Sequence, residues 1–309
     1  MALEADDVER LRAATGRRAI DPGASLFGPR SVTWRVNREM ALLLGGGRAL
    51  LLQVAHPLVA AGVAAHSRFR TEPVARLRRT LDRMLTITFG TAPEALEAVH
   101  DIERVHTRVR GALAADVGPY MRGTPYDAAD PDLLLWVHAT LVDTALLVFE
   151  RFVGPLEPRA RAAYHEESKT VARVLGIPDA LIPDGREAFE AYVAGMIASD
   201  RLAVGDEGRA IAASILHPPV ARGLAPLLGV GRFLTTGLLP PPLRDRYGLG
   251  WSEGRETLLR VVAAVTRRIV PLLPGPIRFM PHARRADARR RRAPARRTRP
   301  ATAAAPAPG

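Results

Sequence analysis

The chain contains no cysteine, few aromatic residues and only short β-branched runs. Without cysteine it can form no disulfide, no cysteine-ligated zinc site, no iron–sulfur cluster and no thiolate-ligated haem. Any bound metal must therefore be held by histidine, aspartate or glutamate, and eight histidines occur among 309 residues. Alanine, leucine and arginine dominate, which is a helix-forming composition. With 47% hydrophobic residues the chain can also bury a sizeable core.

Acidic residues are outnumbered, and the net charge is +12. Much of this charge lies at the end of the chain, because residues 283–309 hold nine arginines and one aspartate, a net of +8. Such an Arg/Ala/Pro-rich segment cannot bury apolar surface, so we expect a disordered tail there. The remainder has no basic stripe interleaved with aromatics, and we expect no specific nucleic-acid partner.

A secretory or membrane-spanning segment is not expected. The acidic start, Met1 to Asp7, has no apolar run typical of a signal peptide. The most apolar stretch, residues 40–65, is interrupted by glycines, Arg48, His56 and Pro57, which is unfavourable for a bilayer span. We therefore expect a cytoplasmic protein, with peripheral membrane contact left open and the oligomeric state unknown.

Helical periodicity extends over most of the chain and strand signals are scarce. Pro73 and Thr91 are good helix starts, and so is Asp130 followed by Pro131. The helices predicted cover 4–15, 33–44 with a stop at Gly45 to Gly47, 48–65, 73–88, 91–113, 131–152, 157–175, 185–203, 207–215, 220–229 and 252–272. The helix over 131–152 is apolar nearly all round and should be central. We predict an all-α fold with one domain, residues 1–282, and a disordered tail, residues 283–309.

His106 interrupts the apolar stripe of its predicted helix. Val99, Ile102, Val109 and Leu113 recur at helical spacing, and His106 falls in the gap between them. This position predicts an imidazole that faces the core. Such a residue either hydrogen-bonds a carbonyl or ligates a metal through a neutral ring nitrogen.

An upstream helix places two arginines and a threonine on one face. At roughly 100° per residue, Arg76 and Thr80 lie about 40° apart, and Arg79 lies about 60° to the other side of Arg76. An arginine fork pairs well with carboxylates such as the two propionates of haem, and a hydroxyl can bond a propionate or bound oxygen. A solvated basic face is the alternative interpretation.

Further histidines lie in apolar helices. His56 and His66 occur among small residues that would allow close approach of a flat cofactor or of another helix. His138 lies within the central helix, where it could be a second ligand, a proton donor or a hydrogen-bonded core residue. It is about 140° round the helix from Asp143, so a direct pair is not expected.

Two Glu-x-x-His matches, Glu97 with His100 and Glu103 with His106, occur on one helix. This spacing is found in di-iron bundles, where each of two helices contributes one such motif. Here the two imidazoles point about 120° apart and cannot share a metal. We interpret the matches as chance.

The ordered series of these segments resembles the family of ER-bound oxygenases of the MpaB type and bacterial rubber oxygenases. The resemblance covers roughly residues 30–235. It is carried by Arg38-Glu39 and the glycine-rich turn after it, Gln53 to Arg70, Arg76 to Gly90, Val105 to Gly111, Tyr126 to Pro131 and the His138 helix.

The resemblance implies an α-helical protein that binds haem b and uses O₂ to cleave carbon–carbon double bonds in isoprenoid chains. It places His106 as the proximal iron ligand and Arg76 and Thr80 in the haem pocket. Arg79 stands where rubber oxygenases have a distal lysine, and arginine cannot ligate iron as a neutral amine can. The iron would then be five-coordinate or take another ligand such as His56 or His66.

The expected function is that of a haem b-dependent oxygenase acting on an apolar, isoprenoid or lipid-like substrate. In this hypothesis His106 ligates the metal, Arg76 anchors a propionate, and Arg79 and Thr80 are the catalytic groups on the distal side. His56 and His138 are further candidate cofactor contacts. The alternatives are a non-haem metal oxidoreductase that uses His106 with Glu103, and a non-catalytic helical haem carrier or sensor.

Overall fold

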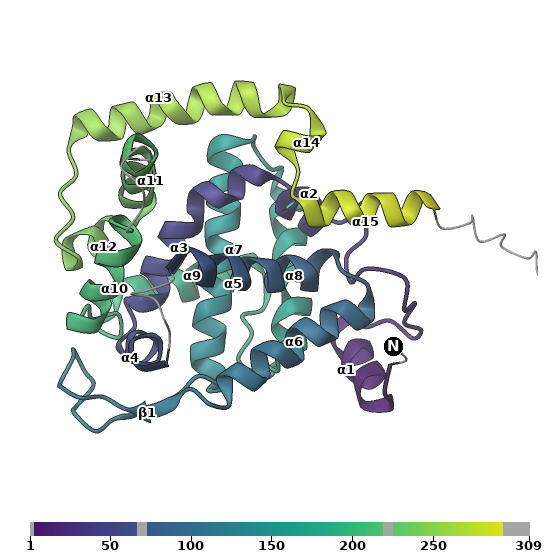
Figure 1. The fold of residues 1–309 in the computed structure, drawn as a ribbon, viewed down its shortest axis with the longest axis horizontal. Helices are drawn as coiled ribbons and strands as arrows, with labels where there is room; N and C mark the ends of the chain where they lie inside the picture. The colour runs from purple at the N-terminus through teal and green to yellow at the C-terminus, as the bar shows by residue number, and fades with distance from the viewer. Residues whose placement is uncertain (1–2, 67–72, 219–224, 293–309) are drawn as a thin grey trace, which may run out of the picture.

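The computed structural model describes residues 3–66, 73–218 and 225–292. It is almost wholly helical, with one small two-stranded sheet in this part of the chain (Figure 1). The elements are α1 (Ala5–Thr15), α2 (Val32–Asn37), the 3-10 helix η1 (Met40–Gly45), α3 (Gly46–Val54), α4 (Pro57–His66), α5 (Pro73–Phe89), α6 (Ala92–His106), β1 (Arg110–Ala112), β2 (Pro125–Asp127), α7 (Pro131–Phe152), α8 (Pro158–Val174), α9 (Gly185–Ala198), α10 (Asp206–Leu216), α11 (Ala225–Leu238), α12 (Pro241–Arg246), α13 (Glu253–Ile269), η3 (Val270–Leu272), α14 (Gly275–Arg278) and α15 (Pro281–Arg292).

Helix α7 is the central element of the fold. It begins where the sequence predicts, because the side chain of Asp130 accepts a hydrogen bond from the backbone N–H of Asp132 and Pro131 occupies the first turn. Trp136 and Phe152 are fully buried along it. Helices α2, α3, α8, α9 and α13 pack around it. The all-α fold with a buried central helix is thus confirmed.

Length and hydropathy alone would allow α7 to cross a membrane. However, more than half of its most apolar window is buried against other helices of the same molecule. The apolar stretch over residues 40–66 is bent by 105° between α3 and α4. Burial against protein thus accounts for the apolar composition of α7.

Helices α5 and α6 form an antiparallel hairpin joined by a tight turn at Gly90. Thr91 and Glu94 form the capping box that starts α6, in which the Thr91 N–H donates to the Glu94 carboxylate at 2.7 Å. Arg83 of α5 faces Asp101 of α6 at 3.8 Å and is the α5 residue whose charge acts on His106.

Two predicted helix boundaries near the N-terminal half are wrong. The predicted helix over 33–44 is divided into α2 and η1, and the glycines at 45–47 do not act as a stop, since α3 begins at Gly46. The cause is packing. A Cβ on Gly47 would lie 2.1 Å from Thr235 Oγ1 of α11, so this glycine permits close contact between α3 and α11.

The helix predicted to reach Leu113 ends instead at His106. Residues 110–112 pair with residues 125–127 in an antiparallel ladder, with Gly111 opposite Tyr126. A side chain at Gly111 would overlap the Tyr126 ring. Val109 and Leu113, which seemed to continue the helical stripe, pack instead in a small cluster with Tyr126.

The predicted disordered tail starts too early. Residues 283–292 belong to α15, whose alanines Ala283 and Ala286 are buried against Trp34, Leu85 and Phe89. The alanine side of this helix packs on the core, and the arginines between the alanines point away from it. An Arg/Ala-rich composition alone did not predict such an ordered helix. The remainder of that prediction, residues 293–309, lies outside the described residues, as do residues 220–224 of the predicted helix over 220–229.

Candidate functional site

His106 is the last residue of α6 and is partly buried. Its ring lies in the electrostatic field of Asp127 from β2, Glu103 from its own helix and Arg83 from α5. Burial is the largest influence and lowers the pKa of His106, while Asp127 and Glu103 act to raise it and Arg83 to lower it. Its ring nitrogens form no hydrogen bond with the described residues, so a neutral nitrogen with a free lone pair is available.

The arginine and threonine face of α5 points away from the core. Arg78, Arg79 and Thr80 are all exposed, and Arg79 has an interaction within the protein. The side chain of Arg76 lies outside the part of the chain that the structure describes. The exposed side of α5 is thus rich in guanidinium groups, which pair well with anionic ligands. Arg83 is the α5 residue whose charge acts on His106.

His56 belongs to a buried polar cluster that sequence reasoning missed. It lies in the turn between α3 and α4 and is 1% exposed. Its Nε2 lies 3.0 Å from the hydroxyl of Tyr120, and that hydroxyl also bonds Arg201. The Nδ1 of His56 is buried without a partner among the described residues. Tyr120 and Arg201 come from loops more than sixty residues away from His56 or from each other, and no local pattern marks them.

His138 faces a different neighbour. It is 7% exposed on α7 and forms a hydrogen bond with the backbone of Ser168 on α8. As expected, Asp143 is not its partner, because that carboxylate pairs with Arg48 at 2.6 Å. The contacts favour the interpretation of His138 as a hydrogen-bonded core histidine.

The predicted histidines are therefore not brought into one cluster. His106 lies beside β2 and α5, His56 beside Tyr120, and His138 beside α8. His66 contacts the carbonyl of Arg110 at 3.1 Å. Within the described ranges, no three histidine, aspartate or glutamate side chains are grouped to hold a metal ion. Glu103, the second ligand of the non-haem alternative, is ion-paired with Arg10.

The two most buried of these imidazoles should make stability depend on pH. Burial lowers the pKa of both His56 and His138 from 6.5 to about 4. Between pH 6.5 and pH 4 these two histidines bind protons in the unfolded chain but stay neutral in the native state. Their contribution to stability is therefore present above pH 6.5 and is lost as the pH falls toward 4. Between pH 7 and pH 5, each of these histidines should lower the free energy of unfolding by about 2 kcal/mol.

Urea unfolding at the two pH values tests this dependence. His138→Gln retains a hydrogen-bonding group but does not titrate, and we expect its loss between pH 7 and pH 5 to be about 2 kcal/mol smaller than that of the wild type. His217→Gln at an exposed position is the matched control and should retain the wild-type loss. Equal losses in all three proteins would contradict a neutral, buried His138.

The architecture and the site together define an all-α protein whose candidate centre uses histidine and arginine without cysteine. The chain belongs to the family described as ER-bound oxygenase mpaB/B'/rubber oxygenase, catalytic domain, whose model matches residues 34–268. The resemblance noted in the sequence is thus confirmed, and membership of an oxygenase family supports an oxygenase activity at that level of detail.

The curated relatives give no further detail of function. Two uncharacterized proteins, Mb2261 of Mycobacterium bovis and Rv2237 of Mycobacterium tuberculosis, are each 26% identical to this chain over 231 residues. The match covers 73% of this chain and 87% of each relative. No solved structure matches the chain significantly.

Proposed function

We propose that this protein is a haem b-dependent oxygenase that acts on an apolar, isoprenoid or lipid-like alkene. The observation that carries the proposal is the partly buried His106 at the end of α6, whose pKa is lowered by burial and which lies near Arg83 of α5, in a chain of an oxygenase family. The donor set fits haem b, since an imidazole with a free lone pair is a common axial ligand and guanidinium groups pair with propionates.

The residues have separate roles in this proposal. His106 would hold the iron through its neutral ring nitrogen, and the carboxylates of Asp127 and Glu103 would increase its electron-donating character. Arg76 would bind a propionate, and Arg79 and Thr80 would orient the polar edge of the site. Haem supplies the activation of O₂ when it is bound. The net reaction adds both oxygen atoms of O₂ across a C=C bond and yields two carbonyl groups.

His56 and His138 have protein partners of their own. The Tyr120 hydroxyl and the Ser168 backbone hold their rings, so we assign them first to the support of the helices around the site. Their contact with the cofactor stays a prediction.

Spectroscopy and oxygen consumption test the proposal in two steps. Protein purified after haem-replete expression should show a Soret band. It should then consume O₂ with squalene, which has isoprenoid double bonds, and form aldehyde or ketone products, but not with squalane, the saturated analogue of the same shape. A protein without a Soret band refutes haem dependence. A Soret band without O₂ consumption on any isoprenoid would indicate the haem carrier or sensor instead.

A further inference from the structure

Helix α13 presents an apolar stripe to solvent. Leu258, Val261, Val265 and Ile269 recur at intervals of three, four and four residues, which places them on one side of the helix. Each of these side chains is at least half exposed. Four large aliphatic residues on one exposed helix face are unusual for a protein surface and indicate an interaction site.

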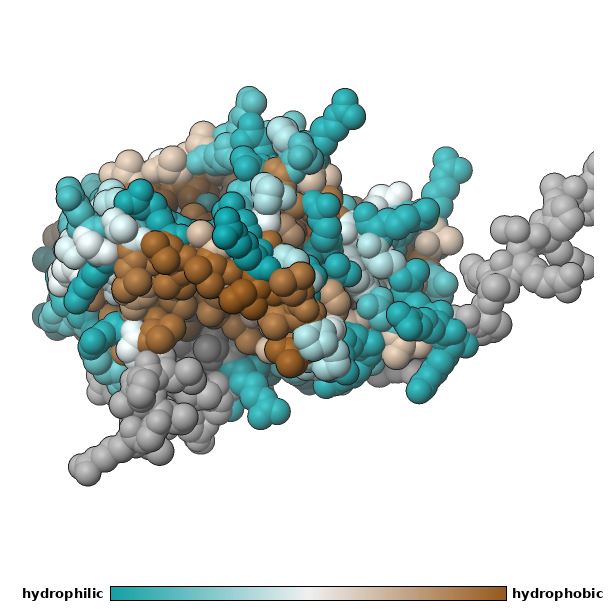
Figure 2. All heavy atoms as spheres, turned by 90° about the horizontal axis from the view of Figure 1, so that it is seen from above, coloured by the Kyte–Doolittle hydropathy of each residue, from teal (hydrophilic) through white to brown (hydrophobic). Residues whose placement is uncertain are grey.

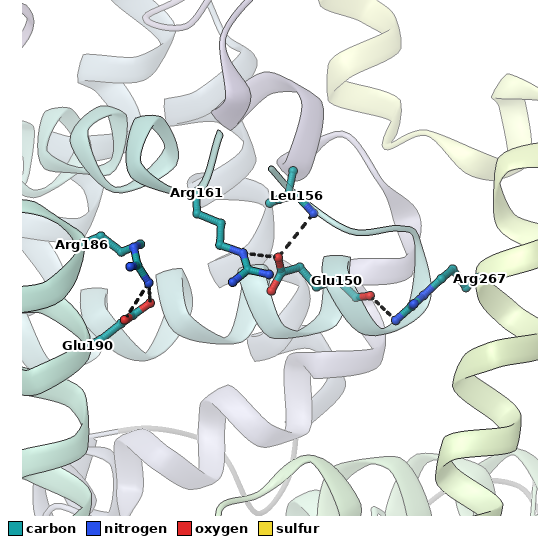
Figure 3. A network of polar contacts seen from close by, with 6 residues as sticks. All are labelled: Glu150, Leu156, Arg161, Arg186, Glu190 and Arg267. Carbon is teal, nitrogen blue, oxygen red and sulfur yellow. Dashed lines mark hydrogen bonds and ion pairs between the residues drawn. The ribbon is translucent and has the colours of Figure 1, made fainter. Parts of the chain in front are cut away.

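The opposite side of α13 is fixed to the core, so the stripe cannot turn inward. Leu259 and Ala263 pack with Phe152 of α7 and Leu238 of α11. Arg267 donates a hydrogen bond of 2.6 Å to the backbone carbonyl of Glu150, near the end of α7 (Figure 3). The Glu150 carboxylate in turn accepts a hydrogen bond from Arg161 Nε on α8. The outward orientation of the stripe therefore follows from the packing of α13 on the folded core.

The apolar surface continues beyond the helix. Leu272 of η3 is 83% exposed and Ile277 of α14 is 62% exposed. Figure 1 shows that α13 lies along one outer side of the molecule, and the chain continues from it through η3 into α14. Figure 2, which looks onto that side, shows an apolar patch with hydrophilic side chains along part of its edge. We call this surface, defined by Leu258, Val261, Val265, Ile269 and Leu272, the α13 face.

Beyond the first turn of α13, which holds Glu253 and Glu256, the charges that the chain contributes along the α13 face are all positive. Residues 257–286 contain six arginines and neither aspartate nor glutamate. Arg278 is paired with Glu39, but the other five form no ion pair with the described residues. Arg260 and Arg268 lie on the exposed part of α13 itself. An apolar stripe bordered by arginines complements a surface that is apolar within and anionic at its boundary.

We propose that the α13 face binds the surface of an anionic lipid membrane, with α13 lying in the plane of the interface. A second copy of the chain fits less well, because a two-fold contact would bring two acid-free, arginine-bearing segments together. A lipid surface offers acyl chains to the aliphatic stripe and phosphates to the arginines. Binding of this kind would place the protein at the membrane, where apolar molecules accumulate. The proposal does not depend on whether the protein binds haem.

Vesicle flotation with the full-length protein tests the proposal. The protein should float with vesicles of phosphatidylcholine mixed with phosphatidylglycerol, and less with phosphatidylcholine alone. The triple variant Leu258→Gln, Val261→Gln, Val265→Gln should lower partitioning at least about tenfold, because each change removes an aliphatic contact while glutamine keeps the helix. Arg260→Gln with Arg268→Gln should weaken binding several-fold on the anionic vesicles alone.

A matched control substitutes exposed apolar residues elsewhere. Met121→Gln with Leu181→Gln alters side chains far along the sequence from α13 and should leave flotation unchanged. All variants keep residues 293–309, so the arginines of that segment are constant. Wild-type protein that stays unbound would overturn the proposal, and so would a triple variant that floats like the wild type. A dimer in sedimentation velocity that the triple variant dissociates would identify a contact between copies instead.

Discussion

Replacement of His106 by alanine should weaken haem binding at least about 100-fold, because it removes the iron–nitrogen bond and leaves the site with ionic contacts to the propionates only. The measurement is titration of the purified protein with hemin, followed at the Soret band. Folding should be little affected, since His106 is the last residue of α6, is only partly buried and forms no ring hydrogen bond with the described residues.

The same helix provides the control for this substitution. His100 lies six residues earlier on α6, is partly exposed and faces Asp7 at 3.3 Å, so His100→Ala removes an imidazole from α6 without touching the proposed ligand. It should bind hemin as the wild type does. Added free imidazole should restore the Soret position in His106→Ala by occupying the vacated space. A His106→Ala variant with unchanged affinity would show that another residue ligates the iron.

The central part of the fold was predictable because its signals are local. The cap at Asp130, the proline at 131 and twenty-two residues with apolar side chains on all faces determine α7 before any tertiary contact is considered. The capping box at Thr91 determines the start of α6 in the same way. Such features depend on residues within one turn of each other, and sequence patterns report them well.

The end of α6 was not predictable on the same grounds. Val109 and Leu113 continue the helical spacing, but the backbone of Arg110 pairs with that of Asp127 in the small sheet and does not continue the helix. The consequence for the site is that His106 lies at a helix end, next to Asp127, and not in the middle of a buried helix. The partners Tyr120 and Arg201 of His56 were missed for a related reason, since only the tertiary fold places them together.

Arg48 shows how far an isolated pattern can mislead. In the sequence it follows three glycines that were expected to end a helix, and it interrupts an apolar stretch. In the structure it is 3% exposed and joins three helices. Its Nε donates to the Leu238 carbonyl of α11 at 2.8 Å, and its guanidinium also bonds Thr144 and Asp143 of α7. Gly47 makes this possible, because it lets α3 approach α11 closely enough for the arginine to reach.

Arg48→Met should therefore lower the free energy of unfolding by about 3 to 5 kcal/mol. Methionine fills much of the volume of the arginine stem, so the loss reports the three hydrogen-bond acceptors that are left without a donor and not a cavity. The measurement is urea unfolding at pH 7. Arg35→Met, which changes an exposed arginine on α2, should alter the free energy by no more than about 0.5 kcal/mol.

A double variant separates the charge from the packing. In Arg48→Met with Asp143→Leu the carboxylate is removed together with its partner, and part of the stability should return, because an apolar pair needs no desolvated ions. Asp143 is 29% exposed and can be hydrated in the single variant, so the expected recovery is about 1 kcal/mol. A single variant as stable as Arg35→Met would mean that Arg48 does not hold α3, α7 and α11 together.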